Sequence, residues 1–302
     1  MQLEQILEEA KKRPKQTIAI ANACDHEVLY AVFLASEMEL AHFQLYGDEG
    51  KIRSILAEID PQGVTEQHVT YIHYEDPSKS VQQAVLAASE KRADILMKGS
   101  VQTAVLLKEI LKEQYGLRTN RTLSQVAVFE LPNYSKVVLL TDGGLNIAPN
   151  LEKKIQITEN AVKVAHALGN KNPKVAMLAA IEQVNPAMPA TTDAALITLM
   201  NKRGQIKDCI IDGPLAFDIA IDRQSKEHKG IESEVAGDAD ILVVPFIEVA
   251  NVLYKSFTLV ANARVGSMLV GAKIPVVLTS RADTFDCRLN SIALAIATAN
   301  KI

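Results

Sequence analysis

The sequence predicts an α/β protein built from βα units around mainly parallel sheets, and three observations support this class. Short runs of β-branched residues alternate with longer segments of helical period along most of the chain. Hydrophobic residues make up 48% of the 302 residues, which is enough to bury a large core. Near the middle, two strand-like runs flank a turn composition typical of a hairpin, which indicates a domain edge. We therefore expect two α/β domains with a cleft between them.

The first part of the chain has the pattern of alternating strands and helices. Strands are expected over residues 17–21, 41–46, 69–74 and 94–97, and helices over residues 27–39, 51–58, 78–91 and 101–114. The last of these strands runs into Lys98, Gly99 and Ser100, where small residues expose backbone N–H groups before a helix begins. A strand-to-helix loop of this kind favours the binding of an anion, because its free N–H groups point at the ligand.

The remaining part begins with the hairpin, expected as strands at residues 124–131 and 136–141 around the turn 132–135. Further strands are expected at residues 174–179, 208–211, 241–245 and 275–279, and helices at residues 151–168, 191–202 and 248–261. In the C-terminal helix, apolar residues recur at the spacing of one buried face: Leu289, Ile292, Ala293, Ile296 and Ala297. We expect one domain of residues 1–131 plus 268–302 and a second of residues 132–267.

Composition and charge argue against several classes of protein. The net charge is −4, with 32 basic and 36 acidic residues mixed along the chain, whereas a nucleic-acid-binding protein would show a basic face. No apolar run approaches the roughly 18 residues of a membrane span, and the N-terminus lacks the apolar region of a signal peptide. The three cysteines form no C-x-x-C pair. We expect a cytoplasmic protein that binds neither nucleic acid nor membrane.

Several common active-site motifs are absent from the sequence. There is no G-x-G-x-x-G after the first expected strand, no G-x-x-x-x-G-K-[ST] and no G-x-S-x-G. The six histidines show no metal-ligand spacing. These absences disfavour a Rossmann dehydrogenase of the usual kind, a P-loop kinase, a serine hydrolase and a resident metal.

The junction between the last strand and the last helix carries the densest polar chemistry. After the apolar run 275–278, Ser280, Arg281, Asp283 and Asp286 follow within a few positions. A guanidinium beside a helix N-terminus forms a good cradle for an oxyanion or a phosphate. The alternative is capping, with Asp283 as the N-cap, Asp286 at the third helical position and Arg281 in a surface ion pair. The residues alone leave both interpretations open.

Four blocks of sequence resemble the phosphate acetyl/butyryl transferase family. Residues 212–218, 235–245 and 273–281 match it in order and with similar spacing, and residues 137–149 are more similar to its butyryltransferase branch than to its transacetylases. The likeness covers essentially the whole chain and is weakest over roughly the first sixty residues. Several blocks that agree in order are far more specific than a single short motif.

This resemblance implies a reversible transfer of a short acyl group, butyryl or branched with four or five carbons, between coenzyme A and inorganic phosphate. It also implies a two-domain fold related to isocitrate and isopropylmalate dehydrogenases, a homodimer or larger homo-oligomer, no metal and no bound cofactor. In the family a Ser-Arg pair stabilises the reacting oxygens and a nearby Asp acts as base. Ser280 and Arg281 match the pair. The transacetylase Asp falls at Cys287 here, so Asp286 is the candidate base and Asp283 the reserve.

Other residues are candidates for substrate binding or an alternative mechanism. Lys98, with Gly99 and Ser100, is a plausible phosphate contact, although a solvated lysine in a tight loop would give the same pattern. Asn146 is a weaker ligand candidate in the turn of residues 142–146. Cys287 could act as a covalent nucleophile at a helix N-terminus, but a cysteine is more often a small buried hydrophobe. We therefore favour direct transfer in a ternary complex.

Two other functions compete with this interpretation. One is an NAD(P)- and metal-dependent dehydrogenase of the related fold, which would need clustered carboxylate ligands and a nicotinamide site. The other is a non-enzymatic coenzyme A-binding protein, which the intact Ser280-Arg281 pair disfavours. Within the family, phosphate acetyltransferase is the alternative activity. One methylene in a pocket changes discrimination by only about 1–3 kcal/mol, so the sequence does not reveal acyl length.

Overall fold

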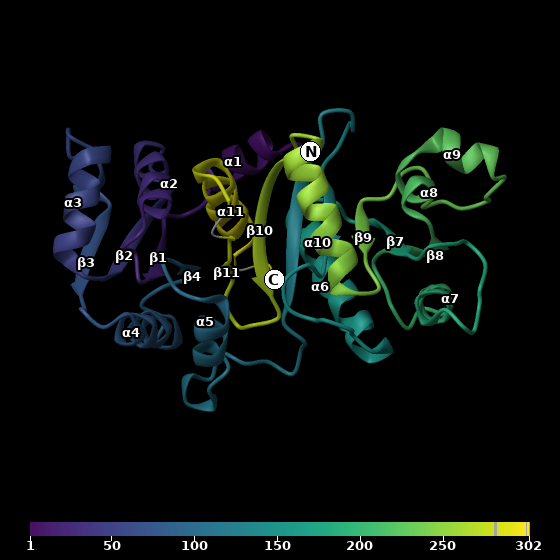
Figure 1. The fold of residues 1–302 in the computed structure, drawn as a ribbon, viewed down its shortest axis with the longest axis horizontal. Helices are drawn as coiled ribbons and strands as arrows, with labels where there is room; N and C mark the ends of the chain where they lie inside the picture. Colours follow the sequence, from purple (N-terminus) through teal and green to yellow (C-terminus); the bar gives the residue numbers. More distant parts are fainter. Residues whose placement is uncertain (281–282, 300, 302) are drawn as a thin grey trace. The chain divides into compact units, whose positions relative to one another are not determined.

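The computed structural model describes residues 1–280, 283–299 and 301. Contacts along the chain separate two compact units of mixed α/β structure (Figure 1). Unit 1 consists of Met1–Gln2, Thr122–Arg264 and Lys301–Ile302, and unit 2 consists of Leu3–Arg121 and Val265–Asn300. Arg281 and Ala282, which follow Ser280, lie outside the described residues.

Unit 2 is built on mainly parallel strands in the order β3-β2-β1-β4-β11-β10. The strands are β1 (Gln16–Ala21), β2 (Ala41–Gly47), β3 (Val69–His73), β4 (Ile95–Lys98), β10 (Arg264–Val270) and β11 (Val276–Val277). Neighbours from β3 to β11 pair in parallel, whereas β10 and β11 pair antiparallel. The carboxyl ends of β1, β4 and β11 therefore meet at one edge of the sheet.

The helices of unit 2 form two groups by their contacts. They are α1 (Leu3–Lys11), α2 (His26–Glu37), α3 (Glu49–Ile59), α4 (Pro77–Ser89), α5 (Thr103–Ile110) and α11 (Phe285–Thr298), with 3-10 turns η1 (Thr65–Gln67) and η2 (Glu113–Tyr115). Helix α11 contacts α1 and α2, and α2 contacts α3, whereas α4 contacts α5 and the strands β1 and β2 (Figure 1).

Helix starts in both units coincide with short polar side chains. Each capping oxygen accepts a hydrogen bond from a backbone N–H in the first turn, which satisfies a donor that the helix itself leaves unpaired. Caps of this kind are Asp25 for α2, Asp48 for α3, Asp76 for α4, Asn150 for α6, Asp222 for α9 and Thr284 for α11.

Unit 1 has the strand order β5-β6-β9-β7-β8. Its strands are β5 (Ser124–Glu130), β6 (Val138–Thr141), β7 (Lys174–Leu178), β8 (Ile210–Leu215) and β9 (Ile241–Val243). The antiparallel pairing of β5 with β6 confirms the hairpin, and the remaining pairs are parallel. The helices are α6 (Leu151–Ala167), α7 (Pro189–Lys202), α8 (Phe217–Ile221), α9 (Arg223–His228) and α10 (Ile247–Lys255), followed by a π-helical turn, η3 (Ser256–Val260).

The structure differs from the sequence-based expectation in three places. Strand β10 was not expected, because Gly266 interrupts its β-forming pattern; a Cβ there would lie 2.8 Å from the carbonyl oxygen of Asn290, so only glycine lets α11 approach β10 this closely. Helices α8 and α9 were also missed, because both are short. Finally, α11 is buried on all sides from Cys287 to Thr298 rather than on one face.

Candidate functional site in unit 2

The loops that follow β1, β4 and β11 meet at the carboxyl edge of the unit 2 sheet, and we call this group of loops the Ser280 site. The register places Ala21 of β1 beside Lys98 of β4, and Met97 of β4 beside Val277 of β11. Ligands of open α/β sheets bind outside the carboxyl ends of strands. Most of the expected site residues, namely Lys98, Gly99, Ser100, Ser280 and Asp286, thus lie at the end of β4, in the loops after β4 and β11, or at the start of α11.

Gly99 is required by the close approach of the loops after β1 and β4. A Cβ at this position would lie 2.0 Å from the carbonyl oxygen of Asn22. The Ser100 N–H donates to this same oxygen at 2.7 Å, and the Asn22 Nδ2 donates back to the Ser100 carbonyl at 2.8 Å. Asn22 itself has a φ of 58°, a left-handed conformation that is uncommon for a residue with a side chain. The two loops are therefore held together by a backbone hydrogen bond and by one from the Asn22 side chain.

Lys98 is the last residue of β4, and only 3% of its surface is exposed. Its Nζ lies 3.4 Å from the carbonyl oxygens of Gly99 and Val101, which are long contacts for a charged donor. The interpretation of Lys98 as a solvated lysine is therefore wrong. A buried ammonium requires hydrogen bonds or a nearby anion, because leaving water is costly for a charge.

The turn after β11 is closed by Asp283. Its Oδ2 accepts a hydrogen bond from the Ser280 N–H at 2.6 Å, and its own N–H donates to the Ser280 carbonyl at 3.2 Å. Ser280 is exposed at this turn. Arg281, the other half of the expected Ser-Arg pair, lies outside the described residues.

The start of α11 is capped by Thr284, whose Oγ1 accepts from the Cys287 N–H at 3.4 Å. The interpretation of Asp283 as the N-cap is therefore wrong. Asp283 lies one residue before the cap, and its carboxylate accepts from the Ser280 N–H instead. Asp286 is exposed in the first turn of the helix, where a negative group also favours the helix dipole. Cys287 is 5% exposed, which fits the expectation of a small buried hydrophobe.

Asn146, the remaining expected ligand, belongs to unit 1. Its Nδ2 donates to the Leu123 carbonyl at 2.8 Å and to the Asp142 carboxylate at 2.5 Å. Asp142 also accepts from the backbone N–H groups of Gly144 and Leu145, so it organises the whole turn. Both amide hydrogens of Asn146 are thus used, one within the turn and one by the Leu123 carbonyl outside it, which leaves its Oδ1 for any further contact.

Sequence reasoning missed Arg288, which is buried in α11 with 2% exposure. Its Nη1 donates to the Thr279 hydroxyl at 2.8 Å, and its Nη2 lies 4.0 Å from the Asp25 carboxylate. Its buried Nε has no hydrogen-bond partner among the residues that the structure describes. One signal was available in the sequence, since no other charged residue occurs from Leu289 to Ala299.

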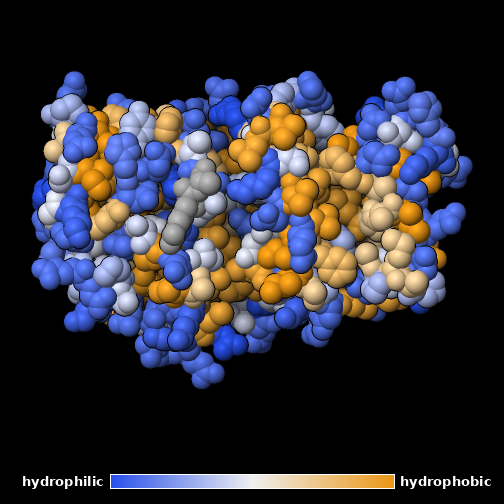
Figure 2. Space-filling view, viewed as in Figure 1, coloured by the Kyte–Doolittle hydropathy of each residue, from blue (hydrophilic) through white to orange (hydrophobic). Residues whose placement is uncertain are grey.

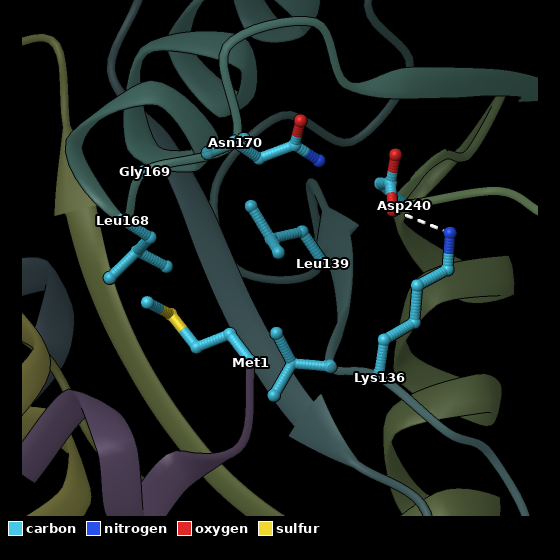
Figure 3. A pocket seen from close by; sticks show the side chains of 9 residues that line it. Met1, Lys136, Leu139, Leu168, Gly169, Asn170 and Asp240 are labelled. Atoms are coloured by element: carbon cyan, nitrogen blue, oxygen red, sulfur yellow. Dashed lines mark hydrogen bonds and ion pairs between the residues drawn. The ribbon is translucent and has the colours of Figure 1, made fainter.

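A hollow of about 340 Å³ in unit 1 lies at the amino ends of strands, where β6 and β9 begin (Figure 3). The side chains of Met1, Leu139 and Leu168 line it, beside the ion pair of Lys136 with Asp240 at 2.6 Å. Catalytic loops of α/β proteins are not expected at the amino ends of strands. The charges at this hollow are, moreover, paired with each other.

Among the described residues, no group of three or more His, Cys, Asp or Glu side chains is arranged to hold a metal ion. In the same part of the chain, no helix is long and apolar enough to cross a membrane.

Comparison with known proteins shows the family of the chain. The family model described as phosphate acetyl/butaryl transferase matches residues 60–296. A protein of Bacillus subtilis named "Probable phosphate butyryltransferase" is 48% identical over 100% of this chain and 99% of its own length. A phosphate acetyltransferase of Thermotoga maritima is 42% identical over 98% of this chain and 99% of its own length.

A solved structure agrees with these relatives. The crystal structure of a branched-chain phosphotransacylase from Enterococcus faecalis superposes with a TM-score of 0.83 at 38% identity, covering 95% of this chain and 100% of that one. Together with the mixed α/β fold, these relatives identify the chain as a phosphate acyltransferase. The chain belongs to the phosphate acetyl/butaryl transferase family.

Proposed function

We propose that this enzyme transfers a butyryl group, or a branched acyl group of four or five carbons, reversibly between coenzyme A and inorganic phosphate at the Ser280 site. The observation that carries the proposal is the meeting of the loops after β1, β4 and β11, which gathers Lys98, Ser280 and the start of α11 at one sheet edge. A relative named for butyryl transfer and a structure named for branched-chain substrates support the acyl range.

In the direction that forms acyl-CoA, the thiol of coenzyme A attacks the carbonyl carbon of an acyl phosphate. A thiol with a pKa of about 8.5 is mostly protonated near neutral pH, so a base that accepts its proton accelerates the attack. Asp286 is our candidate for this base, because it is exposed at the start of α11. Asp283 is held in reserve, because its carboxylate already accepts from the Ser280 N–H.

The tetrahedral intermediate carries negative charge on the former carbonyl oxygen. We assign Ser280 and Arg281 as the donors to this oxygen, in keeping with their match to the family's Ser-Arg pair. When the intermediate collapses, the bond to phosphate breaks and the phosphate dianion leaves. Lys98, with the backbone of Gly99 and Ser100, is proposed to hold that phosphate, and Asn146 remains a weaker candidate for a substrate contact.

Direct attack in a ternary complex is favoured over an acyl-enzyme on Cys287. The Cys287 side chain is 5% exposed in the first turn of a buried helix, so a substrate carbonyl would have to enter the core to reach it. Cys287→Ala should keep most activity, and mass spectrometry should detect no acylated protein when acyl-CoA is added without phosphate.

Release of free coenzyme A thiol from acyl-CoA in the presence of phosphate tests the function. Rates measured from acetyl-CoA to hexanoyl-CoA should peak at four or five carbons, and a clear preference for acetyl-CoA would place the enzyme among the acetyltransferases. Incubation with NAD or NADP, a divalent metal and hydroxy acids serves as the comparison. Reduction of the nicotinamide there would support the dehydrogenase alternative instead.

We further propose that unit 1 forms a homodimer or larger homo-oligomer and that the two units are the two domains of a fold related to isocitrate and isopropylmalate dehydrogenases. Exposed apolar side chains gather on α10 and η3 (Figure 2), and they include Val252, Leu259 and Val260 with 64%, 75% and 80% exposure. A patch of this kind on a surface commonly marks a protein interface. Light scattering should show an oligomer that Leu259→Asp weakens.

A further inference from the structure

Arg288 is a buried cation near the start of α11, and such a residue does not stabilise a helix there. It lies one turn into α11, where the helix dipole disfavours a cation, and it is 2% exposed. The rest of the helix, from Leu289 to Thr298, is uncharged. A buried guanidinium is normally matched by a carboxylate in a bidentate arrangement, because removal of the charge from water is otherwise strongly unfavourable.

The contacts of Arg288 match its charge only in part. The Thr279 hydroxyl is a neutral partner at 2.8 Å. The Asp25 carboxylate lies 4.0 Å from Nη2, beyond hydrogen-bond distance, and its Oδ1 already accepts from the Val28 N–H as the cap of α2. The Nε, buried as well, has no partner in the described part of the chain. Positive charge is therefore left incompletely neutralised beside Thr279.

Thr279 directly precedes Ser280, so this charge lies at the Ser280 site. The parallel pairing of β11 with β4 brings the end of β11 beside Lys98, a second buried cation at the same sheet edge. The incompletely neutralised charge of Arg288 gives this edge a positive potential in a region where water screens poorly. An anion with more than one charge, such as inorganic phosphate, is the ligand that such a potential favours.

We propose that Arg288 is a positioning residue for phosphate: its buried charge raises the affinity of the Ser280 site for the phosphate group without touching it. We assign it no direct contact with phosphate, because it lies within α11 and its Nη1 donates to the Thr279 hydroxyl. Its hydrogen bond to Thr279 additionally holds the chain next to Ser280. This inference rests on the proposed function of the Ser280 site.

Three variants separate the charge of Arg288 from its hydrogen bond. Arg288→Met removes the charge, Arg288→Lys keeps the charge but loses the planar fork, and Thr279→Val keeps the charge but loses the hydrogen-bond acceptor. Arg288→Met should raise the KM for phosphate about tenfold, equal to about 1.4 kcal/mol, while the KM for acyl-CoA stays within about twofold. Arg288→Lys and Thr279→Val should keep the phosphate KM within about threefold of the original enzyme.

Lys154→Met is the matched control. Lys154 is buried to the same degree, with 3% exposure, but its Nζ is paired with the Asp193 carboxylate at 2.7 Å. The control should lower the melting temperature and leave the phosphate KM unchanged. An equal rise of the phosphate and acyl-CoA KM values in Arg288→Met would overturn the inference, since it would indicate general loosening of the site.

A binding measurement separates failure of this inference from failure of the proposed function. Inorganic phosphate should raise the melting temperature of the original enzyme, and the rise should shrink in Arg288→Met but persist in Arg288→Lys. If phosphate binds in this way but no acyl transfer occurs, the function is wrong and the inference stands. If phosphate has no effect on the original enzyme, the inference is wrong. Should Arg288→Met fail to fold, a tenfold rise of the phosphate KM in Thr279→Val, whose charge is intact, would refute it.

Discussion

The two units differ in how closely their buried and half-buried charges are paired with opposite charges. In unit 1, Lys136, Lys174, Asp238 and Asp240 form what we call the amino-end network, near the starts of β6, β7 and β9. Lys136 lies 2.9 Å from Asp238 and 2.6 Å from Asp240, and Lys174 lies 2.6 Å from Asp238. Every charge in this network therefore has an opposite charge at hydrogen-bond distance.

At the Ser280 site of unit 2, the matching is poorer. Arg288 has a carboxylate only at 4.0 Å, and its buried Nε has no hydrogen-bond partner among the residues that the structure describes. Such imperfect pairing lowers stability, because a buried charge loses its hydration without full compensation, and a bound anion would supply the missing partner. From this contrast we expect a division of roles, in which the amino-end network governs stability and the Ser280 site governs turnover.

The largest effect is expected at Asp286. If it is the base, Asp286→Asn keeps the shape of the side chain but cannot accept the thiol proton, so turnover should fall by about 10²–10⁴. The melting temperature should change little, because the side chain is exposed and Thr284 caps the helix. Turnover of the variant should recover partly as pH rises, since solvent then supplies thiolate.

Asp283→Asn is the control for that change. Asparagine can still accept the Ser280 N–H through its Oδ1, so turnover should fall only modestly. An active Asp286→Asn beside an inactive, well-folded Asp283→Asn would show that Asp283 is the base.

The next largest effect is expected at Arg281. Removal of one donor to a developing oxyanion usually lowers turnover by about two to three orders of magnitude, and Arg281→Ala should do the same. Arg281→Lys should recover only part of the loss, because an ammonium cannot reproduce the planar fork. Near-original rates for both variants in the thiol-release assay would remove Arg281 from the site.

Much of the fold could be predicted because the buried face of a strand or helix requires apolar residues at a regular spacing in the sequence. Strands β1, β2 and β3 lie within one residue of the expected ranges at their ends, and the hairpin of β5 with β6 is confirmed. Strand β10 was missed because Gly266 weakens the local β pattern, although its antiparallel partner β11 follows only a few residues later.

The site could be predicted only in part, for a related reason. The loop of Lys98 to Ser100 was found because a strand end followed by small residues has a local signature. The contact of Arg288 with Asp25 had no such local signature, since Asp25 lies near the other end of the chain. The contacts of Asn146 with Asp142 are local, yet they depend on a turn conformation that composition does not specify.

A smaller effect is expected at Gly99, where the Ser280 site depends on the close approach of two loops rather than on charge. A methyl group 2.0 Å from the Asn22 carbonyl oxygen must push the loops after β1 and β4 apart. Gly99→Ala should therefore lower stability by about 3 kcal/mol and reduce turnover as well. Gly50→Ala is the matched control, because the nearest atom there is a side-chain oxygen at 3.4 Å and the residue lies inside α3. That variant should be neutral or stabilised by up to about 1 kcal/mol.

The smallest effect, and the sharpest test of the division, is expected in the amino-end network at Asp238. Burial opposes ionisation of this carboxyl group, but the hydrogen bonds and charges of Lys174 and Lys136 outweigh it and lower the pKa to about 2. A lowered pKa in the folded state stabilises the protein above the unfolded pKa of about 3.9, and this stabilisation is lost as pH falls toward 2.

Asp238→Asn should thus be less stable by about 1 kcal/mol at pH 7, a value reduced by screening because 34% of the side chain is exposed. The two proteins should converge in melting temperature between about pH 5 and pH 2. Turnover and the phosphate KM at pH 7 should be unchanged, and a rise of the phosphate KM in Asp238→Asn would contradict the assignment of this network to stability alone.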